Sequence, residues 1–140
     1  MTDRCCWDRD SASLSRHDDL MGVRVVVVDD NAGFRSMVRR LLEQEGFEVV
    51  GEAAGGVAAL AVVARVRPGL VLLDVSLPDI DGFTVLLRLR AAGDRTPVIL
   101  TSTRAAVDYQ PFLAASTARG FVAKSELSGA RLHTLLGASS

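Results

Sequence analysis

Two runs of apolar residues in this chain end in carboxylates. Val25–Val28 leads directly into the adjacent pair Asp29 and Asp30, and Val71–Leu73 leads into Asp74. Aliphatic runs of this kind are typical of strands that are buried on both faces of a parallel sheet. Adjacent like charges at the end of a buried strand are costly unless a cation lies between them. The three acids therefore predict a site for a hard divalent cation, with Mg²⁺ as the first candidate.

Two further side chains with useful chemistry follow apolar runs. Ser102 ends the run that begins at Pro97, and Lys124 comes just after Gly120–Ala123. Acids, a hydroxyl and a lysine together suit phosphoryl transfer, because the cation, the ammonium and the hydroxyl can each bind a phosphoryl oxygen. One carboxylate can also be the nucleophile. Asp74 is the candidate nucleophile, since it stands alone on its strand and faces the acidic pair.

Hydrophobic periodicity predicts the elements that position these residues. Short apolar runs bounded by Gly, Pro and Asp indicate five strands, and apolar residues at helical spacing indicate five helices between and after them. Asp108 is predicted to cap the fourth helix, with Pro111 in its first turn. The predicted strands are 23–29, 48–53, 70–74, 98–102 and 120–123, and the helices are one from Phe34 to a stop at Gly46, 57–66, 83–90, one after Asp108, and 127–136.

This alternation predicts an α/β fold. The expected architecture is a doubly wound five-stranded parallel sheet of the flavodoxin-like (βα)5 type, with strand order 2-1-3-4-5. In that order the strands leading to Asp29, Asp74, Ser102 and Lys124 are neighbours, so their carboxyl ends line one crevice. The strand at 48–53 lies at the outer edge and offers no comparable group.

Length and composition bound the class of protein. The chain has 140 residues, of which 49% are hydrophobic, and a formal net charge of −1. This is enough for one domain with its own core. The charge gives no sign of direct nucleic-acid binding or of a membrane surface, and no apolar run is long enough to span a membrane. We expect residues 22–140 to form the domain and residues 1–21 to form a disordered tail.

The N-terminal segment is polar and lacks the apolar core of a signal peptide, which favours a cytoplasmic protein. Cys5 and Cys6 are the only cysteines. Neighbouring cysteines do not readily cross-link a fold, so we interpret them as reduced thiols, with a vicinal redox pair as the alternative. Met21 lies directly before the first strand and is a candidate start of translation.

From Val23 to Leu136 the sequence resembles the receiver domain of two-component response regulators. The matching features are the acidic pair Asp29-Asp30, Asp74 within 71–82, and the strand segments 97–102 and 120–124. Each feature is weak alone, but all of them in this order over the whole domain are specific. The resemblance implies a single-domain response regulator.

The resemblance implies a role for each candidate site residue. Asp74 is the implied phosphoacceptor, and Lys124 and the Ser102 hydroxyl are its implied catalytic partners. The implied cofactor is Mg²⁺. Its implied ligands are Asp29, Asp30, Asp74 and the backbone carbonyl of Ser76.

The implied switch consists of Ser102 and the aromatic Phe121, which lacks a hydroxyl. The alternative to Ser102 is Thr101, because only one of two successive strand residues points into the site. Thr103 is larger than the Ala or Gly usual at its position, and we expect it to narrow access to the acyl phosphate. Ser125 stands where the family usually has proline, so the preceding peptide bond is expected to be trans.

Simpler interpretations compete with some of these assignments. Asp29 or Asp30 can cap the helix that follows them, and Asp79 and Asp81 are interpreted as caps or turn formers. A further group is interpreted as the solvated face of the first helix, which could also meet a kinase. This group is Arg35, Arg39 and Arg40.

The implied function is a switch that accepts a phosphoryl group from a sensor histidine kinase. We expect no separate catalytic activity beyond self-phosphorylation from small phosphodonors and slow autodephosphorylation. The face built from the fourth helix, strand 120–123 and the last helix is expected to bind an unknown downstream protein or a second copy. A phosphorylation-independent interaction domain is the alternative, which Thr103 favours. An aspartate-nucleophile phosphatase or a flavin protein fits the loop 29–34 poorly.

Overall fold

A computed structural model gives the arrangement of residues 22–137. The predictions for the tail, Cys5, Cys6 and Met21 lie outside the described residues, as do residues 138–140. Within the described residues every peptide bond is trans, including the bond to Ser125, as predicted.

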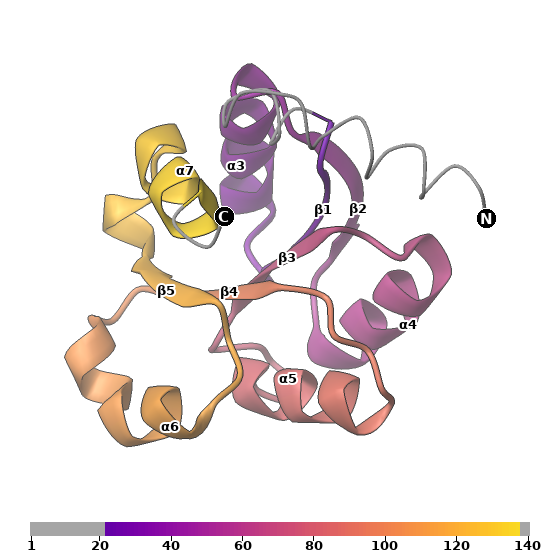
Figure 1. The fold of residues 1–140 in the computed structure, drawn as a ribbon, viewed down its shortest axis with the longest axis vertical. Coiled ribbons are helices and arrows are strands. Elements are labelled where there is room, and N and C mark those ends of the chain that lie inside the picture. Colours follow the sequence, from indigo (N-terminus) through magenta and orange to yellow (C-terminus); the bar gives the residue numbers. More distant parts are fainter. Residues whose placement is uncertain (1–21, 138–140) are drawn as a thin grey trace.

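Five parallel strands form one sheet in the order β2-β1-β3-β4-β5, which confirms the predicted fold class (Figure 1). β3 is central, and β2 and β5 are the edge strands. β1 ends one residue before Asp29, so that acid begins the loop after the strand. The strands are β1 Arg24–Val28, β2 Glu48–Ala53, β3 Leu70–Asp74, β4 Val98–Ser102 and β5 Gly120–Ala123.

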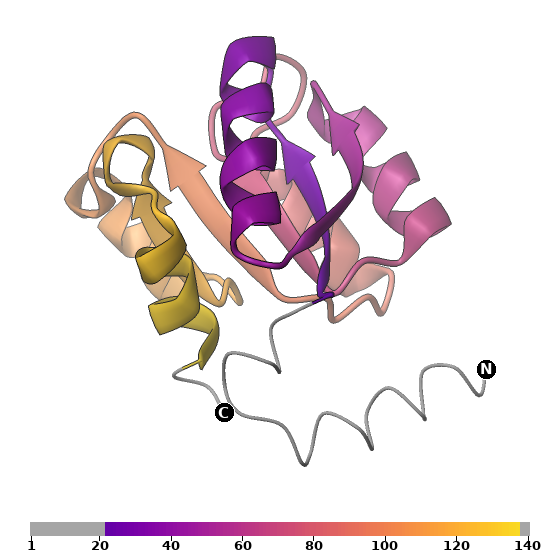
Figure 2. The ribbon, with the colours of Figure 1, turned by 90° about the horizontal axis from the view of Figure 1, so that it is seen from above.

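Helices cover both faces of the sheet. α3 and α7 lie on one face, and α4, α5 and α6 lie on the other (Figures 1 and 2). No helix within residues 22–137 is long and apolar enough to cross a membrane. The helices are α3 Ala32–Gln44, α4 Gly56–Val66, α5 Gly82–Ala91, α6 Gln110–Ala115 and α7 Gly129–Gly137, with 3₁₀ turns η1 Ala106–Tyr109 and η2 Lys124–Glu126.

The valine run of β1 supplies both halves of the core. Val25 and Val27 pack in the cluster beneath α3 and α7, and Val26 and Val28 pack in the cluster beneath α4 and α5. All four are buried, because a strand alternates its side chains between the two faces and both faces are covered here. Burying each valine contributes roughly 1.5–3 kcal/mol relative to leaving it exposed. This core fixes where β1 ends, and therefore where Asp29 and Asp30 begin.

The helix caps separate structural carboxylates from the candidate site. Asn31 Oδ1 accepts a hydrogen bond from the Phe34 N–H and caps α3, so neither Asp29 nor Asp30 serves as its cap. Asp81 caps α5 by accepting from the Thr84 N–H, as predicted.

Asp79 caps a helix that is distant in sequence. Its carboxylate accepts from the N–H groups of Gly56 (2.7 Å) and Val57 (2.9 Å) at the start of α4, whose own cap residue Gly55 has no side chain. These backbone donors lower the pKa of Asp79 to about 2, with Val57 the larger cause. The loop after β3 is thereby tied to α4.

The prediction that Asp108 caps the fourth helix is wrong. Asp108 lies inside η1, where its N–H donates to the Ala105 carbonyl, and α6 begins only after Tyr109. Because Asp108 lies within this tighter 3₁₀ turn, it is not in the position before the first residue of α6 that a cap requires. Pro111 does lie in the first turn of α6, as predicted.

Candidate functional site

Three carboxylates converge at the carboxyl edge of the sheet. Asp29 follows β1 and Asp74 ends β3, and both are buried, whereas Asp30 is exposed. Each residue offers one carboxylate oxygen, and these three oxygens lie within 4.8 Å of one another. The sequence prediction that these acids meet at one edge is therefore met by the geometry.

The two carboxylate oxygens of Asp29 have different partners. The Asn31 N–H donates to Asp29 Oδ1 (2.9 Å). Asp29 Oδ2 is buried and lies 2.5 Å from Lys124 Nζ, yet it accepts no hydrogen bond of acceptable geometry among the described residues. A buried carboxylate oxygen that is neutralised by charge but not bonded is suited to a metal ligand.

Lys124 bridges the two buried carboxylates from the turn after β5. Its Nζ also lies 3.4 Å from Asp74 Oδ2 and 4.5 Å from the ring centroid of Phe34. Burial lowers the Lys124 pKa, but the close pairing with Asp29 and the charges of both carboxylates outweigh it, so the pKa is raised. The lysine is therefore a fixed positive charge beside Asp74.

Burial governs the protonation of Asp74. Desolvation is the largest cause that raises its pKa above the ordinary value, and the charge of Asp29 raises it further. The Ser76 N–H, which donates to Asp74 Oδ1 (3.1 Å), and Lys124 act in the opposite direction. A cation at this edge would favour the ionised form, since opposite charges stabilise one another. Three carboxylate oxygens, grouped at one edge, are hard donors that fit a divalent cation.

The end of β3 is held closely by the first residue of α5. The Gly82 N–H donates to the Val75 carbonyl (2.8 Å). A Cβ at Gly82 would lie 2.5 Å from the Asp74 carbonyl oxygen, closer than real Cβ atoms approach. Only glycine allows this approach, and it fixes the backbone that carries Asp74.

The hydroxyl side of the edge is arranged differently. Ser102 is buried at the end of β4, and its Oγ lies 3.0 Å from the Tyr109 hydroxyl and accepts from the Arg104 N–H (3.0 Å). Thr101 is the register partner of Asp74 and is also buried. The choice of Ser102 over Thr101 as the switch hydroxyl stays a prediction. Thr103 is exposed, and its effect on access stays a prediction too.

Phe121 is half-buried on β5, with its ring centroid 5.8 Å from that of Tyr109. The sequence reasoning missed Tyr109, because nothing in the local pattern around residue 109 indicates contact with β4. It missed Phe34 beside Lys124 for the same reason.

Arg35 and Arg39 remain partly exposed on α3, but both also pair with Glu52 on β2, a contact that the sequence did not predict. Arg35 Nε and Arg39 NH2 contact the Glu52 carboxylate at 3.0 and 2.6 Å, and Arg39 is the main cause that lowers its pKa. Arg35 NH1 also donates to the Asp29 carbonyl (2.6 Å). Sequence alone gave no signal of this contact, since Glu52 is distant along the chain. Arg40 is exposed, as predicted.

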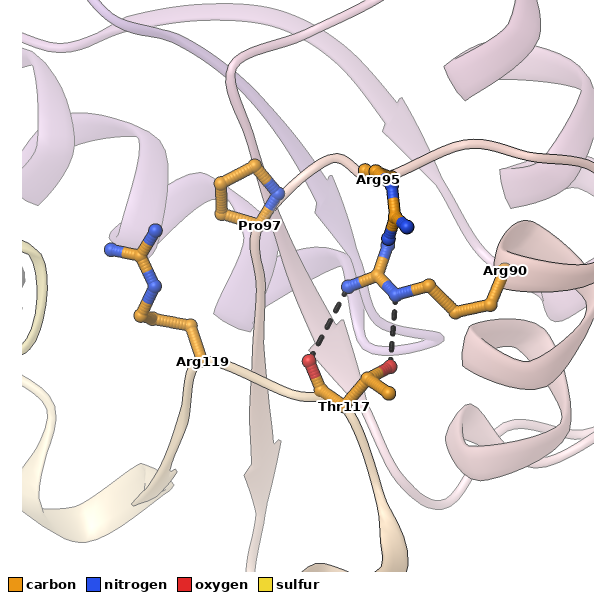
Figure 3. Close-up of a pocket in the computed structure, with 5 residues that line it drawn as sticks. All are labelled: Arg90, Arg95, Pro97, Thr117 and Arg119. Carbon is orange, nitrogen blue, oxygen red and sulfur yellow. Dashed lines mark hydrogen bonds between the residues drawn. The ribbon is translucent and has the colours of Figure 1, made fainter.

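A shallow pocket of about 250 Å³ lies near the amino ends of β4 and β5, opposite the acidic edge (Figure 3). Arg90 donates from Nε to Thr117 Oγ1 (2.8 Å) and from NH1 to the Asp94 and Thr96 carbonyls. These acceptors belong to the chain itself, so Arg90 clamps the loops that enter the two strands. The pocket is lined by Arg90, Arg95, Pro97, Thr117 and Arg119.

Comparison with known proteins identifies a family model that spans most of the chain. The model described as the response regulator receiver domain matches residues 25–136. Among solved structures, the signal receiver domain of NarL from Mycobacterium tuberculosis superposes with a TM-score of 0.70 at 37% identity, covering 84% of this chain and 98% of that one.

Curated relatives are longer than this chain. BvgA of Bordetella pertussis is 34% identical over 116 residues, covering 83% of this chain and 54% of that protein. The response regulator MprA of a Mycobacterium species is 41% identical over 87 residues, covering 62% of this chain and 37% of that protein. The chain thus spans about half or less of the length of these relatives.

Proposed function

The chain belongs to the response regulator receiver domain family, and on that premise we propose that it accepts a phosphoryl group on Asp74 from a sensor histidine kinase. The observation that supports this most is the placement of Asp74: it is buried, 3.4 Å from Lys124 Nζ, and grouped with Asp29 and Asp30 around a possible cation position. Such a site supplies most of the catalysis, since positioning and electrostatics dominate phosphoryl transfer.

In the proposed step a carboxylate oxygen of Asp74 attacks phosphorus. The phosphorus–nitrogen bond to the kinase histidine breaks, a phosphorus–oxygen bond to Asp74 forms, and the imidazole, already protonated on its other nitrogen, takes the electron pair of the broken bond and leaves as the neutral ring. The acyl phosphate is later hydrolysed: water attacks it, inorganic phosphate is released, and the Asp74 carboxylate is regenerated. We expect this hydrolysis to be slow. Small phosphodonors such as acetyl phosphate can replace the kinase. No further catalytic activity is proposed.

Each residue at the edge has a separate task. Lys124 neutralises one phosphoryl oxygen and the Ser102 hydroxyl donates to another, while the Ser76 N–H orients the Asp74 carboxylate. When bound, Mg²⁺ supplies charge neutralisation of the remaining oxygens. The residues that would hold it are Asp29, Asp30, Asp74 and the Ser76 carbonyl.

We further propose that the signal is read at the face formed by α6, β5 and α7. Ser102 at the end of β4 and Phe121 on β5 link the phosphorylation site to this face. A downstream protein or a second copy of the chain would bind there, in the cytoplasm. Val107 and Phe112 leave apolar surface beside it, being 73% and 61% exposed.

Phosphorylation by acetyl phosphate with Mg²⁺ tests the proposal. Intact mass should show one phosphoryl adduct, which alkaline pH or hydroxylamine removes. Asp74→Ala should abolish it, whereas Asp108→Ala, which removes an exposed aspartate without side-chain partners among the described residues, should retain it. No adduct on the wild-type protein with either acetyl phosphate or a phosphorylated histidine kinase would contradict the proposal and favour the phosphorylation-independent interaction domain.

A further inference from the structure

The Ser102 hydroxyl is engaged by groups that do not belong to the acidic cluster. Its Oγ lies 3.0 Å from the Tyr109 hydroxyl and accepts from the Arg104 N–H. Within residues 22–137 these are its hydrogen bonds, and neither involves Asp74 or Lys124. Ser102 is therefore held by hydrogen bonds that do not involve the position of a phosphoryl group on Asp74.

Tyr109 connects this hydroxyl to a row of aromatic rings. Its ring centroid lies 5.8 Å from Phe121 and 5.9 Å from Phe83, and Phe83 lies 5.6 Å from Phe112. Tilted rings at these separations attract one another. The row therefore runs from the buried hydroxyl of Ser102 to Phe112, which is largely exposed on α6.

We propose that Tyr109 is a positioning residue that holds Ser102 in its resting orientation and is released on phosphorylation. This inference rests on the proposed function of Asp74. When Ser102 turns to donate to a phosphoryl oxygen, its Oγ moves away from Tyr109, and the hydrogen bond between them is lost. The phenol is then free to move together with Phe121 and Phe83. Phe121 has no hydroxyl, so in this chain the polar contact between the switch hydroxyl and the aromatic row belongs to Tyr109.

The hydrogen bond can be tested without phosphorylation, because Tyr109 is the only tyrosine of the chain. Protein labelled with 3-fluorotyrosine should give a single ¹⁹F resonance that reports on this side chain. Ser102→Ala should shift that resonance in the free protein. Thr101→Val, which removes the neighbouring buried hydroxyl, should leave it in place. An unchanged resonance in Ser102→Ala would overturn the proposal.

Release is tested with beryllofluoride and Mg²⁺, titrated by calorimetry. Tyr109→Phe keeps the ring and removes the hydroxyl, so it should bind beryllofluoride about threefold to tenfold more tightly than the wild-type protein, as expected for one neutral hydrogen bond. In a Ser102→Ala background the same substitution should have no effect. Equal or weaker binding of beryllofluoride by Tyr109→Phe, or an equal gain in affinity in both backgrounds, would overturn the proposed role of Tyr109.

The two measurements separate this inference from the proposed function. A wild-type protein that neither takes up a phosphoryl group nor binds beryllofluoride overturns the proposed function, and the role of Tyr109 in activation with it. If the wild-type protein does both but Ser102→Ala leaves the ¹⁹F resonance unchanged, only the proposed role of Tyr109 is overturned.

Discussion

The two halves of the candidate site are built differently. In the carboxylate half, Asp29 and Asp74 extend from strands whose side chains are almost wholly buried, and Arg35, Lys124 and Gly82 hold them from three directions. The hydroxyl half comprises Ser102, Tyr109 and Phe121. It leans on η1 and α6, in which no residue is buried. Ser102 itself ends the fully buried β4, so the difference between the halves lies in the segment that carries Tyr109.

This difference matches the two tasks of a phosphorylation switch. Electrostatic catalysis requires groups that are already in place, because reorganising them would add to the barrier. Switching requires an element whose two arrangements differ by little free energy, and such elements have few buried contacts. On the proposed function, the buried contacts are concentrated where the phosphoryl group would be bound, and are fewest in the segment at η1 and α6 beside the hydroxyl.

The largest effect is expected from Gly82→Ala in the carboxylate half. The new Cβ would collide with the Asp74 carbonyl oxygen, which cannot move without displacing β3. We expect a loss of about 1–3 kcal/mol in the free energy of unfolding, measured in urea, and slower phosphoryl uptake. Gly69→Ala is the control, because a Cβ there meets only an ordinary contact at 3.4 Å. Equal effects of the two substitutions would break the comparison.

Acid should loosen the carboxylate half through Asp79. Its pKa of about 2 is depressed, so its contribution to stability is complete above the unfolded pKa of about 4 and is lost as the pH falls toward 2. Asp79→Ala should lower the thermal midpoint at neutral pH, and the gap from wild type should close in acid. Asp79→Asn retains a hydrogen-bond acceptor, so it should remove only the part of the pH dependence of the thermal midpoint that Asp79 contributes. A gap that is constant from pH 7 to pH 2 would contradict this role.

A smaller effect is expected at Thr103. Because its side chain is exposed, Thr103→Ala should change the free energy of unfolding by no more than about 0.5 kcal/mol. If its bulk narrows access to Asp74, the rates of phosphoryl uptake and hydrolysis should rise by up to about tenfold, equivalent to about 1.4 kcal/mol of barrier. Thr103→Ser should give a similar rise if bulk is the cause. A rise confined to Thr103→Ala would assign the effect to the hydroxyl instead.

The smallest effect on stability is expected at Phe112. Phe112→Ser should alter unfolding by about 0.5 kcal/mol or less, since most of the ring is already exposed. Leu87→Ser, at a similarly exposed position on α5, is the matched control. Sedimentation of the beryllofluoride-loaded protein should show self-association weakened by Phe112→Ser alone. If Leu87→Ser weakens it equally, the apolar surface of the hydroxyl half has no special role in association.

The sequence predicts the strands of both halves well, since β4 and β5 have the predicted bounds, but it predicts the segment that packs against Ser102 poorly. Val25–Val28 and Leu70–Leu73 are continuous apolar runs that only a doubly covered strand explains, and their positions fix Asp29 and Asp74 at one edge. The helix at η1 and α6 has no such run. Asp108 resembles a cap in sequence, but the chain there forms a 3₁₀ turn.

Sequence reasoning missed several residues because each contacts a different element of the fold. Arg35 on α3 forms an ion pair with Glu52 on β2. The ring of Phe34 lies beneath Lys124. Tyr109 is hydrogen-bonded to Ser102 at the end of β4. Helical or strand periodicity says which face a residue is on, and not which partner it meets there. Such contacts follow from the topology only after the sheet has been assembled.

The clamp formed by Arg90 has a consequence for the approach of a partner. Arg90, Arg95 and Arg119 lie near the amino ends of the strands, and Asp29, Asp30 and Asp74 lie at the carboxyl ends. In a chain with a formal net charge of only −1, these groups contribute a charge separation, and so a dipole, along the strands, which Lys124 at the acidic end partly offsets. In the field of a charged protein such a dipole experiences a torque, which presents one end first. Binding of a divalent cation would weaken that dipole, so the metal would also change how often encounters begin in a productive orientation.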